Sequence, residues 1–175
     1  MSTSLDLDSR KKIYELIANN PGVNLSTIAE LLEMSIPLVD YHTKHMADSG
    51  LISIIKEEGK GFKRYFLEGK MGIQDKKFLG VLRQETPLKI VLFLLEHPYS
   101  KHREILDHFE VAGSTLSYHL KKLIRCDVVQ YFEGGEQKGY VVKNEQEVIH
   151  FLIQYKPSKT LKRFKETWAD DFYIP

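Results

Sequence analysis

The most constraining feature of this sequence is an internal repeat. A shift of 77 residues aligns the chain on itself without a gap through the first half of each copy. Each copy predicts a short helix, a loop broken by proline, a second helix, a tight turn and a third helix, followed by a strand, a glycine turn and a strand. The coinciding residues are Ile13 with Ile90, Pro21 with Pro98, Ile28 with Ile105, Tyr41-His42 with Tyr118-His119, and Lys44 with Lys121.

The repeat divides the 175 residues into two small domains with an addition at the end. We expect a first domain over residues 1–70, a linker over 71–85, a second domain over 86–144 and a C-terminal helical extension over 145–175. A hydrophobic content of 42% and an aromatic content of 11% can fill two small cores, so the chain is expected to be ordered.

Composition also bears on where the protein acts. The sequence contains no run of about 18 apolar residues, so no membrane span is expected. Residues 1–8 have neither the basic nor the apolar region of a signal peptide. The single Cys126 cannot form an internal disulfide, which fits a reducing interior. These features together predict a cytoplasmic protein.

In the first copy, apolar residues at helical spacing and turn residues between them set the expected elements. Ser26 and Ser35 are predicted to cap the second and third helices, and Pro37 lies near the start of the third, where its missing N–H has no effect. The expected helices cover Ser9–Asn20, residues 25–32 and residues 36–49, and the expected strands cover Leu51–Glu57 and Phe62–Leu67.

The second copy has the same order, with helices at Ile90–Glu96, Lys101–Phe109 and Ser114–Cys126 and strands at Val128–Glu133 and Lys138–Val142. Its first helix is apolar on several faces, so we expect it to pack against the other copy or a second subunit. Two amphipathic helices, over 145–155 and 158–169, follow. We expect them, together with the apolar helix around Ile90–Leu95, to form a homodimer; alternatively, the tail covers an exposed face of the second domain.

This order of elements is the plan of the winged helix-turn-helix fold, which is mainly α with small β-hairpin wings. The stretch from Ser114 to Leu123, Ser-Thr-Leu-Ser-Tyr-His-Leu-Lys-Lys-Leu, resembles the recognition helix of ArsR-like and MarR-like transcriptional regulators. The tandem arrangement, together with Tyr155-Lys156-Pro157-Ser158 and Thr167-Trp168-Ala169-Asp170, resembles archaeal regulators with two such domains in one chain. The resemblance implies a transcriptional regulator that binds double-stranded DNA.

Carried over by position, the outward side chains of the second recognition helix would meet base edges and phosphates. The first copy departs from this pattern, because Ile36, Leu38 and Asp40 stand among its reading positions. An ordinary solvated helix face is the alternative reading of these residues. The expected DNA contacts on the two helices are Ser114, Thr115, Ser117, Tyr118, Lys121, Lys122 and Arg125 in the second copy and Tyr41 and Lys44 in the first.

The two hairpins have the opposite bias. The first turn is flexible and basic, and its Lys60, Lys63 and Arg64 are expected to contact phosphates or the minor groove, unless the tip is merely solvated. The second turn, residues 133–138, is close to neutral. One copy could therefore bind DNA weakly while the other serves assembly.

The overall charge favours a second hypothesis. Twenty-five basic and 24 acidic residues give a net charge of +1, whereas DNA-binding proteins usually carry a basic surface. Tandem winged helices also occur in chromosome-condensation accessory proteins and basal transcription factors, where the fold mainly contacts protein. An interaction or assembly module is therefore the alternative function.

Metal and catalytic sites find little support in the sequence. One cysteine cannot supply the paired thiolates of a metal sensor, although His42 and His45, three residues apart on a helix, could share a metal. His42 and His119 occupy the same repeat position, which favours a structural role such as a hydrogen bond within each domain. No catalytic or phosphate-loop motif is present, so no enzyme activity, cofactor or metal is expected. The sequence does not identify an effector.

Overall fold

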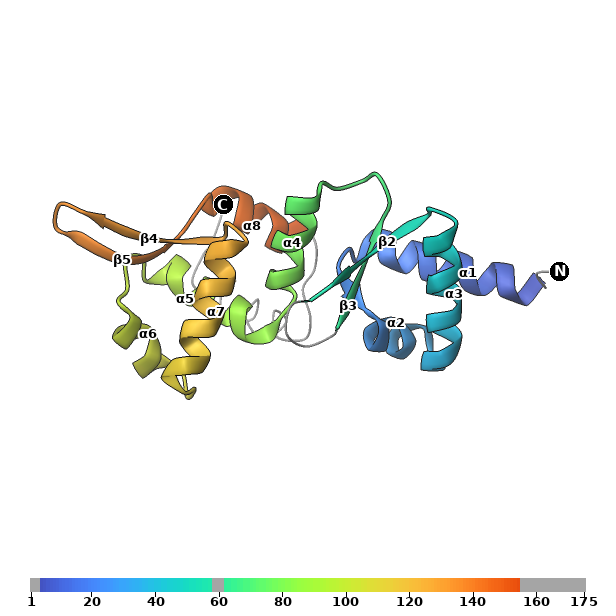
Figure 1. Cartoon of the computed structure of the whole chain (residues 1–175), viewed down its shortest axis with the longest axis horizontal. Helices are drawn as coiled ribbons and strands as arrows, with labels where there is room; N and C mark the ends of the chain where they lie inside the picture. Colours follow the sequence, from blue (N-terminus) through green and yellow to red (C-terminus); the bar gives the residue numbers. More distant parts are fainter. Residues whose placement is uncertain (1–3, 58–61, 155–175) are drawn as a thin grey trace, which may run out of the picture. The chain divides into compact units, whose positions relative to one another are not determined.

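The computed structural model describes residues 4–57 and 62–154 (Figure 1). These residues form a mainly helical fold with two small antiparallel sheets, as predicted. The chain separates into two compact units, with the boundary between Gly80 and Val81.

The first unit contains three helices and a three-stranded sheet, followed by most of a fourth helix that crosses the unit boundary. The sheet has the order β1-β3-β2, and Ile54 of β2 lies opposite Tyr65 of β3. The short strand β1, which pairs Val23 with Tyr65, was not expected from the sequence. The elements are α1 (Ser4–Asn19), β1 (Val23–Asn24), α2 (Leu25–Leu32), α3 (Ile36–Asp48), β2 (Ile52–Lys56) and β3 (Lys63–Leu67).

Local hydrogen bonds determine where α2 begins. The side-chain oxygen of Asn24 accepts a hydrogen bond of 2.8 Å from the backbone N–H of Thr27. Ser26 donates its hydroxyl to the same oxygen at 2.9 Å. Asn24 is therefore the N-cap, and the prediction that Ser26 caps α2 is wrong. Ser35 does occupy the N-cap position of α3, without a side-chain hydrogen bond, and Pro37 lies in the first turn.

The core of the first unit is formed by one face of each helix and the inner face of the sheet. Ile13 and Ile17 are four residues apart on α1, and Val39 and Met46 are seven apart on α3, as a helix with one buried face requires. The fully or almost fully buried side chains are Ile13, Ile17, Val23, Ile28, Ala29, Val39, Met46, Ile52 and Tyr65.

A regular helix, α4 (Ile73–Leu82), occupies most of the segment expected to be a linker. Lys76 donates its ammonium group to the hydroxyl of Ser53 on β2 at 2.7 Å. The start of α4 is therefore attached to the sheet of the first unit. The apolar side chains of Phe78, Leu79 and Leu82 are buried.

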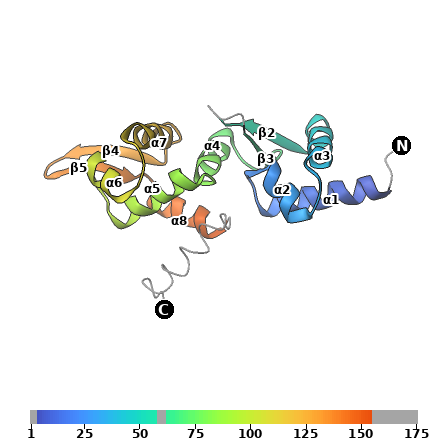
Figure 2. The ribbon, with the colours of Figure 1, turned by 90° about the horizontal axis from the view of Figure 1, so that it is seen from below.

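The second unit repeats the plan with a longer hairpin, whose tip extends beyond the helices of this unit (Figure 1 and Figure 2). The hairpin strands pair from Val129 with Val142 to Gly134 with Gln137. The elements are α5 (Glu85–Glu96), α6 (His102–His108), α7 (Gly113–Arg125), β4 (Val129–Gly134), β5 (Gln137–Val142) and α8 (Glu145–Gln154). The predicted helices and strands correspond to these elements, with α5 starting five residues earlier than expected.

Helix α5 is the central helix of the second unit. Its side chains from Ile90 to Leu94 are all buried within the single chain, and the helix contacts α7 and β5. The expectation that this helix contributes an apolar surface to a dimer is therefore wrong, because that surface is already covered. Its apolar character reflects burial on several sides at once.

The tail begins as expected with a helix. Val148 and Leu152 of α8 are buried, as the covering role of the tail requires, while Ile153 is 63% exposed. The second tail helix, foreseen over 158–169, lies outside the described residues.

Gly139 of β5 is packed against the backbone before α6. The N–H of Tyr140 donates to the carbonyl of Ser100 at 2.8 Å, which draws this backbone onto the hairpin. A Cβ atom at position 139 would lie 1.9 Å from the carbonyl oxygen of Tyr99. Only glycine therefore allows the hairpin to lie this close to the segment between α5 and α6.

Replacing Gly139 by alanine should lower the free energy of unfolding by about 2–4 kcal/mol, because backbone atoms must move to relieve the contact. Chemical denaturation of the full chain measures this change. The control is Gly80→Ala in α4, where a new Cβ meets nothing within 4 Å and should be neutral or stabilise by up to about 1 kcal/mol. Equal stability of the two variants would contradict the tight contact.

Candidate nucleic-acid interface

The outer face of α7 carries a stripe of polar and basic side chains. Ser114, Tyr118, Lys121 and Arg125 are exposed and follow the spacing i, i+4, i+7 and i+11, which places them on one side of the helix. Thr115 is exposed beside them. The opposite side is fixed in the core by Leu116, Leu120 and Leu123, which are buried. The predicted reading positions Ser114, Thr115, Tyr118, Lys121 and Arg125 are thus brought together on one surface.

Ser117 has a different role from the one predicted. Its hydroxyl donates to the carbonyl of Gly113 at 2.9 Å, and Nε2 of His102 lies 2.9 Å from the same oxygen. Because the single hydroxyl hydrogen is given to Gly113, the hydroxyl accepts from His102, whose Nε2 therefore carries a proton. Ser117 thus joins α7 to α6 and has no hydrogen left to donate to DNA.

Lys122 is also directed inward. It is only 8% exposed, and its ammonium group donates to the side-chain oxygen of Gln84 at 2.9 Å. The same nitrogen lies 5.9 Å from the ring centre of Tyr118. The structure therefore corrects the prediction of a phosphate contact: Lys122 fixes the orientation of α7 from behind the exposed stripe.

Helix α3 presents a less polar face. Ile36, Leu38 and Tyr41 are exposed, with Tyr41 at 58%. Asp40 lies between two cations, since Nζ of Lys44 is 2.6 Å and Nζ of Lys63 is 3.7 Å from its carboxylate oxygens. The hydrogen bond from Lys44 lowers the pKa of Asp40, and Lys63 adds to the lowering against the opposing effect of partial burial. The acid therefore stays charged, neutralises part of the local positive charge and joins β3 to α3.

Arg64 is not available at the first wing. It is 8% exposed, forms an ion pair with Glu57 and donates to the carbonyl of Gly22 at 3.3 Å. Its guanidinium group thus holds the three strands of the small sheet together, and the prediction of a phosphate contact is corrected. Lys60 lies outside the described residues. The cations predicted for this wing are Lys60, Lys63 and Arg64. Among them, Lys63 is the one whose side chain the structure describes at the surface.

The second wing is close to neutral and partly aromatic. Glu133 and Lys138 form an ion pair across the hairpin. Tyr131 and Phe132 are exposed on β4, and the ring of Tyr131 lies 5.0 Å from that of Tyr140. These aromatic residues were not singled out from the sequence. The sequence feature that could have identified them is a pair of neighbouring aromatic residues in a short strand. Neighbouring residues of a strand point to opposite faces, and this exposed strand cannot bury both faces.

The two repeat histidines are buried, but His42 lacks the hydrogen bond expected of it. Its side chain is 1% exposed, and in the described part of the chain neither ring nitrogen has a hydrogen-bond partner. Burial lowers the pKa of His42, although Asp6 favours its charged form. His45 is exposed instead and lies 3.4 Å from Arg10. The described residues contain no group of three metal-binding side chains.

Two sequence profiles of known families match the chain, one in each repeat. Residues 6–53 match the profile described as winged helix-turn-helix DNA-binding, and residues 84–131 match that of the bacterial regulatory proteins of the arsR family. The first range covers most of α1 and all of α2 and α3, and the second covers α5, α6 and α7. Both units of the chain therefore have the winged helix-turn-helix fold.

Relatives of this tandem winged helix-turn-helix protein include a curated protein of the archaeon Methanocaldococcus jannaschii, the uncharacterized HTH-type transcriptional regulator MJ1398. It is 27% identical over 135 residues, which are 77% of this chain and 33% of the relative. The chain thus spans about a third of that protein's length. The predicted resemblance to tandem archaeal regulators is confirmed at this level.

A solved structure, FabT of Streptococcus pneumoniae in complex with DNA, aligns with 70% of the tandem winged helix-turn-helix protein and 76% of its own chain. The TM-score is 0.33 and the identity 12%. Within the described ranges, every helix is too short or too polar to cross a membrane.

The buried His42 predicts a pH dependence of stability. Because its pKa is lowered in the folded state, the unfolded chain binds the proton more readily. The free energy of unfolding should therefore be unaffected well above about pH 6.5 and should fall as the pH drops below that value. Urea denaturation between pH 8 and pH 5 measures the effect.

Replacing His42 by leucine should flatten this pH dependence, whereas replacing the exposed His150 of α8 by glutamine should preserve it. A His42→Leu profile parallel to that of the natural chain would remove His42 as its source.

Proposed function

We propose that this protein is a DNA-binding transcriptional regulator that reads duplex DNA mainly through α7. The observation that carries this proposal is the exposed stripe of Ser114, Thr115, Tyr118, Lys121 and Arg125, presented on a helix whose other face is fixed in the core. Hydroxyl groups can bond to base edges and phosphates, while Lys and Arg suit phosphates and guanine. This function requires no catalytic group, and we propose that it operates in the cytoplasm.

The first unit is proposed to contribute sequence-independent contacts. Tyr41, Lys44 and Lys63 lie at its surface, but Asp40 neutralises part of the positive charge. Apolar side chains at Ile36 and Leu38 have no hydrogen bonds to offer to base edges. The second copy would therefore provide the sequence specificity, and the first would provide sequence-independent contacts.

The reading helix is tested against a duplex selected from random sequences. Thr115→Ala and Tyr118→Ala should each weaken binding to the selected duplex by about 1–3 kcal/mol if the side chain contacts a base, with little change on unrelated DNA. Lys121→Ala should weaken binding to both duplexes and reduce the salt slope by about one unit.

The matched control is Lys89→Ala, which removes the same charge from an exposed, ion-paired lysine of α5. Fluorescence anisotropy over a series of salt concentrations measures all variants. If Lys89→Ala and Lys121→Ala behave alike, or if both α7 variants at Thr115 and Tyr118 keep full specific affinity, α7 is not the reader.

Asp40 provides a test in which the affinity for DNA is expected to rise and not to fall. Asp40→Asn should release Lys44 and Lys63 and so raise the affinity for DNA of any sequence, with a salt slope steeper by about one to two units. Asp48→Asn removes the same charge at the end of α3 and serves as control. The same anisotropy series checks both. An equal gain from the two variants would indicate a general charge effect and not a local one.

A protein-interaction module is the second candidate function. Net charge near zero and the exposed Ile36, Leu38 and Tyr41 on α3 favour it. Binding to duplex DNA that weakens steeply with salt supports the regulator, and an absence of such binding supports the interaction module.

We further propose that the regulator is a homodimer that uses the tail. Since α5 is covered, the support within the described residues is the exposed Ile153 at the end of α8. A two-fold dimer would favour a palindromic site with half-sites about 34 Å apart or a multiple of it. Sedimentation at micromolar concentration should give twice the chain mass of 20.3 kDa, and Ile153→Asp should shift it towards monomer. A monomer that still binds DNA would reject the dimer.

A further inference from the structure

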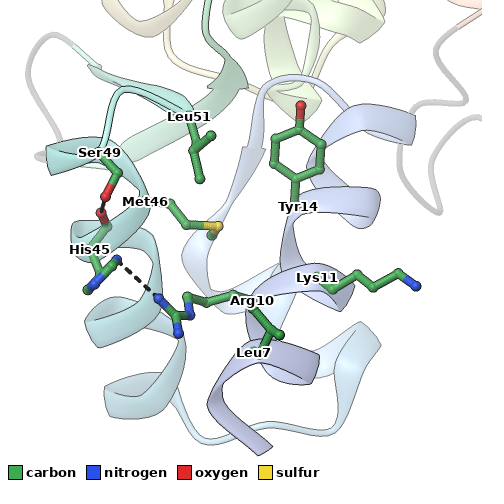
Figure 3. Close-up of a pocket in the computed structure, with 8 residues that line it drawn as sticks. All are labelled: Leu7, Arg10, Lys11, Tyr14, His45, Met46, Ser49 and Leu51. Carbon is green, nitrogen blue, oxygen red and sulfur yellow. Dashed lines mark hydrogen bonds between the residues drawn. The ribbon is translucent and has the colours of Figure 1, made fainter. Parts of the chain in front are cut away.

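The first unit contains a groove that the DNA-binding surface does not use. It has a volume of about 480 Å³ and lies between α1 and the second half of α3, with Leu51 before β2 at its end (Figure 3). The lining side chains of α1 are Leu7, Arg10, Lys11 and Tyr14, at the spacing i, i+3, i+4 and i+7 that places them along one side of the helix. The groove therefore follows α1 for about 10 Å.

Most of the groove surface is apolar. Met46 of α3 is buried at its floor, while the walls include Leu7, Tyr14 and Leu51, of which Leu7 is 66% exposed. Contiguous exposed apolar side chains around a concave surface are typical of a ligand site. The volume also falls within the range of about 300–1,000 Å³ that is usual for small-molecule pockets.

The polar groups of the groove are cationic or neutral. Arg10 extends across it, with Nη1 3.4 Å from Nδ1 of His45 and Nε 3.2 Å from the backbone oxygen of Asp6 (Figure 3). Because a guanidinium group can only donate, Nδ1 of His45 is the acceptor and orients the arginine. Lys11 adds a second cation at the outer edge, and none of the described side chains lining the groove is acidic.

A second copy of the chain does not fit this charge pattern. Arg10 and Lys11 lie midway between Leu7 and Tyr14, so an α1 helix docked antiparallel about a two-fold axis would bring four cations together. Like charges at such distances repel. The groove instead matches an occupant with an apolar body and a negative charge.

We propose that the groove binds a small amphipathic carboxylate, with the hydrocarbon part over Met46 and the carboxylate at Arg10. Charge-assisted hydrogen bonds between guanidinium and carboxylate are the strong and oriented ones. His45 and Met46 belong to α3 and Ser49 is its C-cap residue, so the ligand contacts the third helix of the first winged helix-turn-helix unit. This inference concerns binding alone and is tested without DNA, so it stands or falls separately from the proposed function.

The test uses calorimetric titration of the full chain with decanoate, below the concentration at which decanoate forms micelles. Decanoate should bind saturably with one molecule per chain and raise the melting temperature. The affinity for neutral decanol should be lower by about tenfold or more, because decanol lacks the charge. Equal binding of decanoate and decanol, or the absence of saturable decanoate binding, would overturn the proposal.

Paired variants then locate the site. Arg10→Met keeps the apolar stem and removes the charge, and should weaken decanoate binding about tenfold. Lys11→Met should weaken it to a smaller extent and serves if Arg10→Met does not fold. The control Lys12→Met removes an equal charge from the neighbouring residue, which pairs with Asp8 at 3.0 Å outside the groove, and should change binding less than twofold.

Two results with these variants would contradict the proposal. If Lys12→Met weakens decanoate binding as much as the two groove variants do, the effect is general attraction of an anion and the site is rejected. If Arg10→Met instead changes the sedimentation of the ligand-free chain, the groove is occupied by a second copy and the proposal is wrong.

Discussion

The burial of one stripe of each third helix is the constraint on which the remaining structure depends. In α3 this stripe includes Val39 and Met46, and in α7 it includes Leu116, Leu120 and Leu123. A helix is a rigid body with 100° between successive side chains, so fixing the inward stripe also fixes which residues point outward. The exposed faces of α3 and α7 are therefore consequences of core packing and do not depend on a partner.

The two copies use this common scaffold for different surfaces, and one repeat position illustrates the difference. Asp40 in the first copy corresponds to Ser117 in the second. Asp40 joins α3 to the wing through Lys63, whereas Ser117 joins α7 to α6 through His102. Each interaction holds the third helix of its unit to a different neighbour. The copies are thus similar in their cores and have diverged at the contacts that orient their outer faces.

Much of the fold could be predicted because the periodicity of apolar residues in helices and in strands depends on local spacing alone. The inward residues of α7 and the strands of both hairpins follow from such patterns. Arg64 and Lys122 could not be placed in this way, because their partners Glu57 and Gln84 are brought to them by the tertiary structure. A long cationic side chain looks the same in sequence whether its charge meets solvent or a buried acceptor. Likewise, the segment Ile90–Leu95 of α5 is apolar on several faces, and the pattern did not show whether its neighbours were in the same chain.

The near-zero net charge is compatible with DNA binding once the charge is considered element by element. Helix α7 carries Lys121, Lys122 and Arg125 and no acidic residue, whereas α3 has Asp40 and Asp48 against a single Lys44. Interactions between exposed charges are largely screened beyond about 8–10 Å at moderate salt. A phosphate near α7 would therefore experience the charge of that helix much more than the total of the chain. The acidic residues that balance the count lie on other elements, so the total of +1 says little about the surface of α7.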